Sequence, residues 1–156
     1  MRIRIVAVGT KMPPWVGAVV ADYQQRLPAE IGVEWREVRA EPRGESGQPA
    51  SWMRREAERI RAALPVGARL VMLDERGRDL DTRQLAARLD AWRNDARPVA
   101  IIIGGPDGLD AELKASADET LRLSSLTLPH PLVRVLLAEQ LFRAWSILAN
   151  HPYHRG

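Results

Sequence analysis

Segments patterned like β-strands alternate with segments patterned like amphipathic helices along the whole of this 156-residue chain. Alternating or continuous apolar runs predict strands at residues 2–8, 33–39, 68–74, 99–103 and 120–123. Helical periodicity predicts helices at about residues 14–27, 51–64, 81–94, 110–117 and 132–149. Strands that alternate with helices form a mainly parallel sheet with helices on both faces. The sequence therefore predicts an α/β fold, and its length predicts a single domain over residues 1–156.

The charge balance of the chain is only mildly basic, with 23 lysines and arginines against 20 acidic residues. All but Lys11 and Lys114 are arginines, which bind phosphate through a bidentate fork. This composition permits a nucleic-acid partner without requiring one. The absence of cysteine excludes disulfides and thiolate metal sites. The apolar start is too short for a secretion signal, and no apolar run reaches membrane-spanning length, so we expect a cytoplasmic protein.

Three segments follow predicted strands at the edge where parallel sheets bind ligands, namely residues 73–74, 104–108 and 124–129. Residues 104–108 read Gly-Gly-Pro-Asp-Gly, which has neither the dinucleotide-binding spacing nor the P-loop ending. Glycines after a buried strand let the backbone approach a ligand, and Asp107 is placed to cap the next helix. Hydroxyls and leucines in residues 124–129 suit an adenosine-like ligand held by main-chain hydrogen bonds, without a charge clamp. A turn and a loop that bind no ligand explain these patterns almost as well.

The C-terminal part of the chain concentrates groups that can donate, accept or titrate. All 3 histidines of the chain lie there, together with Tyr153, Arg134 and Arg155. Pro152 prevents the long helix from continuing, so the residues after it follow a rigid helix end. Disorder is the alternative, because chain ends ordinarily fray. Two histidines without nearby acidic or thiol ligands are weak evidence for a metal, and we expect none.

The predicted helix over residues 132–149 is apolar on most sides. Its polar residues Glu139, Arg143 and Ser146, with Asn150 after it, form one narrow stripe. A helix that is apolar on most sides must be covered on most sides, which suggests packing on the sheet and against a second subunit. Arg134 lies in the first turn, where a cation opposes the helix dipole, so we expect an anionic partner for it. A carboxylate within the fold and a substrate phosphate are both suitable partners.

These motifs together resemble those of the ribosomal RNA large-subunit methyltransferase H family. The resemblance covers the opening Val-Ala-Val-Gly-Thr-Lys-Met-Pro, the glycine segment and the run Ser-Ser-Leu-Thr-Leu-Pro-His-Pro-Leu-Val-Arg that starts at Ser124. It also covers Glu-Gln-Leu-Phe-Arg-Ala-Trp and the ending Asn-His-Pro-Tyr-His-Arg. The resemblance implies the SPOUT class, in which a C-terminal trefoil knot binds S-adenosylmethionine and the enzyme is a homodimer. It implies methylation of N3 of a pseudouridine in the helix 69 loop of 23S ribosomal RNA, on the assembled ribosome.

The resemblance also assigns roles to individual residues of this chain. The positions that match the family's cofactor-binding residues are Leu73, Gly105, Ser124, Ser125, Leu126, Thr127, Leu128 and Pro129. The positions that match its substrate-side catalytic group are His130, Arg134, Tyr153, His154 and Arg155. A neutral histidine or a water held by Tyr153 is suited to accept the N3 proton, with Arg134 or Arg155 stabilising charge on the base. Stacking of Tyr153 and His154 on the base is the alternative role.

Two other functions share parts of this pattern. A SPOUT enzyme with another target, such as a transfer RNA ribose 2′-oxygen, would share the pocket but lack the His-Pro-Tyr-His-Arg ending. A non-catalytic ribosome-binding factor would share the arginines but would need no glycine-lined pocket. Binding of S-adenosylmethionine separates an enzyme from a binding module.

Overall fold

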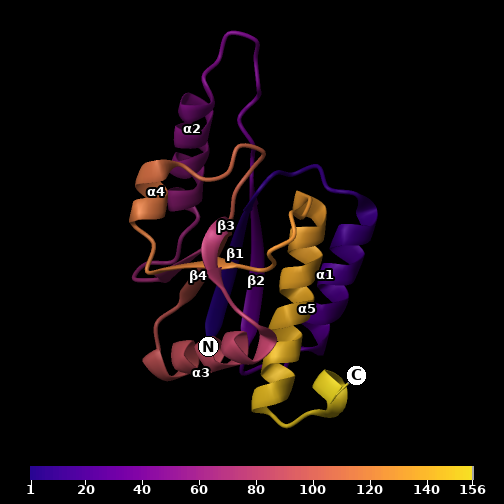
Figure 1. Cartoon of the computed structure of the whole chain (residues 1–156). Coiled ribbons are helices and arrows are strands. Elements are labelled where there is room, and N and C mark those ends of the chain that lie inside the picture. The colour runs from indigo at the N-terminus through magenta and orange to yellow at the C-terminus, as the bar shows by residue number, and fades with distance from the viewer. Residues whose placement is uncertain (156) are drawn as a thin grey trace.

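The computed structural model describes residues 1–155 and shows a five-stranded parallel sheet with helices on both faces (Figure 1). The strands lie in the order β2-β1-β4-β3-β5. The elements are β1 (Arg2–Val8), α1 (Pro14–Arg26), β2 (Gly32–Val38), α2 (Pro49–Ala62), β3 (Arg69–Asp79), α3 (Thr82–Asp95), β4 (Val99–Ile103), α4 (Ala111–Ala115), β5 (Glu119–Arg122), α5 (His130–Leu148) and the 3₁₀ helix η1 (Pro152–Arg155). The predicted α/β class with a parallel sheet is confirmed. Among the described residues, no helix is long and apolar enough to cross a membrane.

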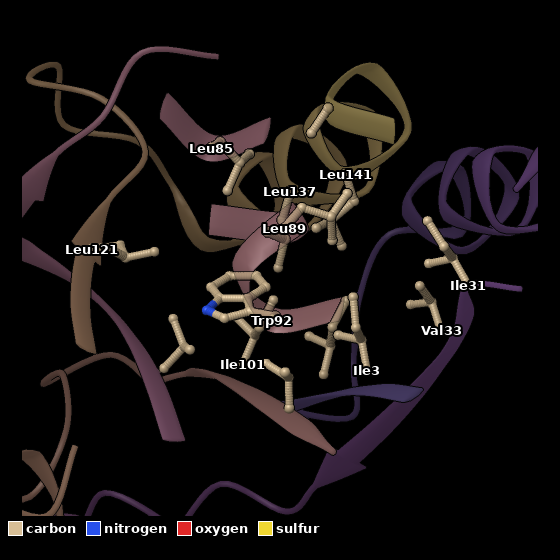
Figure 2. Close-up of a cluster of buried hydrophobic side chains, with 14 of the residues drawn as sticks. Ile3, Ile31, Val33, Leu85, Leu89, Trp92, Ile101, Leu121, Leu137 and Leu141 are labelled. Atoms are coloured by element: carbon tan, nitrogen blue, oxygen red, sulfur yellow. The ribbon is translucent and has the colours of Figure 1, made fainter. Parts of the chain in front are cut away.

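The two faces of the sheet are buried by different helices. On one face, Ile3, Ile5 and Ile101 pack with residues of α3 and α5 around Trp92 (Figure 2). On the other face, Val6 and Ile102 pack with apolar residues of α2 and α4. Alternate residues of β1 and β4 thus serve opposite cores, and every residue of β4 is buried. The central strands are therefore fixed on both sides, and their carboxyl ends form a rigid edge for a site.

Strand β3 extends further than the sequence predicted. The prediction ended the strand at Asp74, whereas β3 continues to Asp79. A bulge lies between Leu73 and Arg78, and both residues pair with Leu121 of β5. Within the bulge, a Cβ on Gly77 would lie 2.6 Å from the Leu121 backbone, so only glycine fits there. Pairing with β5 therefore makes a strand of a polar segment that has no alternating pattern.

The start of α4 and the end of α5 also refine the predictions. Asp110, not Asp107, caps α4, and its carboxylate accepts a hydrogen bond from the backbone N–H of Leu113 at 3.1 Å. The predicted cap at Asp107 is therefore wrong. Asn150 adopts a left-handed conformation with φ 54° just after α5, which ends the helix. Beyond it, the described tail forms η1.

Candidate functional site

The three segments predicted to converge do line one pocket, of about 670 Å³, at the carboxyl edge of the sheet. Leu73 comes from β3, Gly105 from the turn after β4, and residues 124 and 126–128 from the loop after β5. Ser125 and Pro129 belong to the same loop but do not line the pocket. The pocket contains His130 as well, because α5 begins at this edge. Sheet topology therefore brings the predicted cofactor-side segments together.

The Gly-Gly-Pro-Asp-Gly turn, residues 104–108, closes on itself at the mouth of β4. The backbone N–H of Gly108 donates to the carbonyl of Gly105 at 3.0 Å, and Gly108 has a φ of 88°, which favours glycine. A Cβ on Gly104 would lie 2.9 Å from the Gly108 backbone. A Cβ on Gly105 would lie 3.0 Å from a methyl carbon of Val8 and 3.3 Å from Glu56, away from the pocket. A side chain at Gly105 would therefore press on the packing behind the turn and would not fill the pocket.

An ion pair in the pocket wall was not predicted. The ammonium of Lys114 lies 3.2 Å from a carboxylate oxygen of Asp74, and both residues line the pocket. Burial alone would raise the pKa of Asp74, but the backbone N–H of Arg76 and the Lys114 ammonium outweigh it and hold the pKa below its usual value. A ligand held without a charge clamp stays a prediction, although the pocket wall contains this ion pair. The acid at the predicted strand end was the only sequence signal for this pair.

His130 links the glycine turn to α5 through both of its ring nitrogens. Its Nδ1 lies 3.0 Å from the carbonyl oxygen of Gly104, and its Nε2 accepts a hydrogen bond from Arg134 Nε at 2.9 Å. Since Nε2 accepts, the ring is neutral with its proton on Nδ1, donated to Gly104. Burial and, secondly, the Arg134 charge lower the pKa of His130. The imidazole is thus a neutral bridge whose nitrogens are both occupied.

Arg134 is buried at the start of α5 and has the anionic partner that its position required. Its guanidinium pairs with the Glu37 carboxylate and donates to the carbonyl of Gly9 at 2.8 Å. The partner observed is therefore a carboxylate of the fold, the first of the two alternatives. Glu37 lies near the carboxyl end of β2 and Gly9 follows β1, so Arg134 fastens α5 to this edge of the sheet.

Tyr153 anchors the tail to α1 and α5. Its hydroxyl lies 3.0 Å from the Tyr23 hydroxyl and 3.2 Å from the Glu139 carboxylate. Its ring packs edge-on against Phe142, with ring centroids 4.6 Å apart. Burial and, next, the bond to Tyr23 raise the pKa of Tyr153, so the phenol stays protonated. The tail thus covers the polar stripe of α5. The sequence did not predict that Tyr23 binds Tyr153, because the position of Tyr23 in its helix suggested only core packing.

The tail residues after Tyr153 are held more loosely. His154 Nδ1 lies 3.4 Å from the Ser146 hydroxyl, and the exposed Arg155 reaches Asn150 at 3.5 Å. The tail packs at the C-terminal end of α5, opposite the end where His130 lies (Figure 1). A helix of 19 residues spans about 27 Å. Within one chain, the predicted substrate-side group is therefore split, with His130 and Arg134 in the first turns of α5 and residues 153–155 packed against its C-terminal half.

Comparisons with known proteins agree with the architecture and the motifs. A family model described as a predicted SPOUT methyltransferase matches residues 1–154. A Bordetella avium (strain 197N) protein called ribosomal RNA large subunit methyltransferase H is 59% identical over 156 residues, covering 100% of both chains. A protein of the same name from Burkholderia ambifaria (strain MC40-6) is 57% identical with the same coverage. The solved structure of a probable methylase family protein from Haemophilus influenzae Rd KW20 has a TM-score of 0.56 and 18% identity, over 97% of this chain and 69% of that chain, which supports the fold alone.

Proposed function

This chain belongs to the SPOUT methyltransferases and, within them, to the ribosomal RNA large subunit methyltransferase H family, and we propose that it methylates N3 of a pseudouridine in the helix 69 loop of 23S ribosomal RNA. Its acceptor would be the assembled ribosome, in the cytoplasm, and residues 1–156 would form one SPOUT domain with a C-terminal trefoil knot. The observation that carries the proposal is the glycine-lined pocket at the carboxyl edge, formed by the segments that match the family's cofactor motifs.

The pocket fits S-adenosylmethionine in size and in the character of its lining. Its volume of about 670 Å³ lies within the usual range for small-molecule sites, about 300–1,000 Å³. Leu73, Leu126 and Leu128 offer apolar contact, and the glycine turn and the loop after β5 offer main-chain groups. When bound, S-adenosylmethionine supplies a methyl group already activated by its sulfonium, so the protein mainly has to position the acceptor. We assign cofactor binding to Leu73, Gly105, Ser124 and residues 126–128, which line the pocket, and we propose that Ser125 and Pro129 shape the same loop.

The contacts of the catalytic candidates divide them into two groups. His130 and Arg134 are hydrogen-bonded to each other, His130 also contacts the glycine turn, and Arg134 pairs with Glu37 of β2. We therefore assign both residues to positioning the pocket. The pKa of Tyr153 is raised, and its hydroxyl is bound to Tyr23 and Glu139, so it anchors the tail. His154 and Arg155, which have no such positioning or anchoring role, are the remaining candidates for the chemistry at the base. His154, or a water that it orients, would accept the N3 proton, and Arg155 would stabilise negative charge on the base carbonyls.

Because one chain separates its tail from its pocket, we propose that the active site is shared between two subunits. The apolar groups left exposed near the pocket support a homodimer: Trp15, Leu126 and Leu132 are 46%, 75% and 40% exposed. A second copy that covers this surface would remove apolar area from water. In such a dimer the partner's His154 and Arg155 would approach the pocket of the first subunit.

Methyl transfer from tritiated S-adenosylmethionine to purified ribosomes tests the assignment. Ribosomes from a strain that lacks the modification should accept label in 23S ribosomal RNA, and ribosomes with uridine in place of the pseudouridine should accept much less. A short unmodified stem-loop should be a poor acceptor, since recognition by the single α/β unit of residues 1–155 would depend on the shape of a large partner. Label in transfer RNA and none in ribosomes would assign the pocket to another SPOUT target.

A substitution that fills the pocket should block cofactor binding without disturbing the fold. Ala111 lines the pocket from the exposed start of α4, so Ala111→Trp adds an indole there without backbone strain. We expect the dissociation constant for S-adenosylmethionine, measured by calorimetry, to rise at least about 10-fold, or about 1.4 kcal/mol. Glu112→Trp is the matched control, because Glu112 is exposed and does not line the pocket. Equal binding by a folded Ala111→Trp variant would place the cofactor elsewhere.

A further inference from the structure

The segment between β2 and α2, residues 39–48, extends beyond the carboxyl edge of the sheet (Figure 1). Within this segment, Arg43 lies over the ring of Trp52, with its guanidinium carbon 5.2 Å from the ring centroid. Glu41 in the same segment receives hydrogen bonds from Arg55 at 2.8 Å and from Arg59 at 2.5 Å. Residues 39–48 are therefore tied to α2 by charged groups, although none of them lines the cofactor pocket.

Glu56 of α2 is a buried carboxylate directly behind the glycine turn. Its side chain is only 2% exposed, and an oxygen of it lies where a Cβ on Gly105 would approach within 3.3 Å. The carboxylate accepts hydrogen bonds from the backbone N–H of Glu41 at 2.9 Å and from Arg43 Nη1 at 2.6 Å. A charge so buried is tolerated only with a close cation and several donors. Arg43 is that cation.

Arg43 also reaches the glycine turn itself. Its Nε donates to the Asp107 carboxylate at 3.0 Å, and its Nη2 lies 2.9 Å from the same oxygen. Asp107 is the only residue in the Gly-Gly-Pro-Asp-Gly turn with a polar side chain, so this contact is the only one that the turn can make through a polar side chain of its own. On the opposite side, His130 binds the carbonyl of Gly104. A glycine-rich turn has much conformational freedom to lose, and these two contacts restrict it.

We propose that Arg43 is a positioning residue of the cofactor pocket, which fixes the glycine turn by bridging Glu56 and Asp107. The inference rests on the proposed function, in which this turn binds S-adenosylmethionine. The planar fork of arginine is required, because one guanidinium serves a buried carboxylate on one side and the turn on the other. Residues 39–48 thus act as a strap that holds the turn from the α2 side.

The test compares Arg43→Gln with Arg55→Gln by calorimetry with S-adenosylmethionine and by amide hydrogen exchange. Arg43→Gln should raise the dissociation constant about 10-fold, because displacement of a binding element by a fraction of an ångström has effects on this scale. The Gly108 amide, which is bonded to Gly105, should exchange faster in this variant. Arg55→Gln removes an exposed cation that pairs with Glu41 of the same strap and does not touch the turn, while Arg59 still binds Glu41, so both readouts should stay close to wild type.

Two further variants separate the tether from the buried charge that Arg43→Gln leaves on Glu56. Arg43→Lys should recover only part of the affinity, since one ammonium cannot bridge Glu56 and Asp107 as the fork does. The double variant Arg43→Gln/Glu56→Gln carries no buried charge but still lacks the tether, so its affinity should remain low. Full recovery in the double variant, or unchanged binding and exchange in Arg43→Gln, would overturn the inference. If the wild-type protein bound no cofactor, the proposed function would fail, while exchange at Gly108 would still test the tether.

Discussion

Replacing both His154 and Arg155 with alanine is expected to lower methyl transfer to ribosomes at least about 100-fold, the usual scale for losing a positioned proton-transfer or charge-stabilising group. Binding of S-adenosylmethionine and the fold should be unchanged. The pocket lies at the other end of α5, and Tyr153, which anchors the tail through Tyr23 and Glu139, stays in place. Single-turnover transfer from labelled cofactor, with cofactor binding measured on the same preparation, separates the two effects.

The matched control is His151→Ala. His151 is exposed in the same tail and packs against Trp145 with ring centroids 5.4 Å apart and ring planes tilted by 40°, but it has no proposed role in transfer. The rate of methyl transfer by His151→Ala should stay within a few-fold of wild type. Removing the whole tail is less informative, because loss of Tyr153 would also uncover Phe142. A near wild-type rate in the double alanine variant would move the chemistry to the His130 side of the pocket.

Mixed dimers show which subunit's tail serves which pocket. A subunit with the two tail substitutions can be co-expressed with an Ala111→Trp subunit, whose pocket is filled. If the partner's tail completes each site, every mixed dimer contains one intact site, so random pairing in a two-fold dimer restores about a quarter of wild-type activity. If each tail serves its own subunit, no mixed dimer contains an intact site and activity stays low.

The order of elements was predictable because it depends on local patterning. Strand β4, Val99–Ile103, was predicted to the residue, since a continuous apolar run lies between Pro98 and Gly104. The extension of β3 could not be predicted in this way, because residues 74–79 are mostly charged and become a strand only by pairing with β5. The same limit explains Asp107, whose neighbours suggested a helix cap but whose carboxylate binds Arg43.

The segments of the candidate site were predictable from the rule that parallel sheets bind ligands at their carboxyl edge. The side-chain contacts that organise the site were not. Arg134 and Glu37 are 97 positions apart, and Arg43 and Asp107 are 64 apart. Tyr23 and Tyr153 are separated by 130 positions. No periodicity in one sequence shows which of 23 cations meets which of 20 acidic residues, so these pairings required the fold.

Arg134→Met is expected to lower the free energy of unfolding by about 3 kcal/mol, at the low end for breaking a buried ion pair, because Glu37 is half-exposed and can be resolvated. The Gly9 carbonyl and the His130 ring would both lose their donor. For a chain of this size the midpoint of thermal unfolding should fall by about 6–12 °C. Arg93→Met, which breaks an exposed pair with Asp90, should change stability by less than about 0.5 kcal/mol. A loss of similar size in both variants would show that Arg134 does not fasten α5 to the sheet.

The pH dependence of the same variant tests the link between Arg134 and His130. Burial and then the Arg134 charge lower the folded-state pKa of His130 below the ordinary value of 6.5. The unfolded chain therefore binds this proton more tightly than the folded chain. The contribution of neutral His130 to the unfolding free energy is fully present above pH 6.5 and is lost as the pH falls through the folded-state pKa. Arg134→Met removes the second cause of the lowered pKa, so its unfolding free energy should fall less between about pH 7 and about pH 5 than that of wild type. Denaturant titrations at the two pH values measure these changes, and an equal fall in unfolding free energy for the variant and wild type would contradict the coupling. A smaller fall in the variant would show that the neutral state of His130, which holds the glycine turn, depends on the charge of Arg134, which fastens α5.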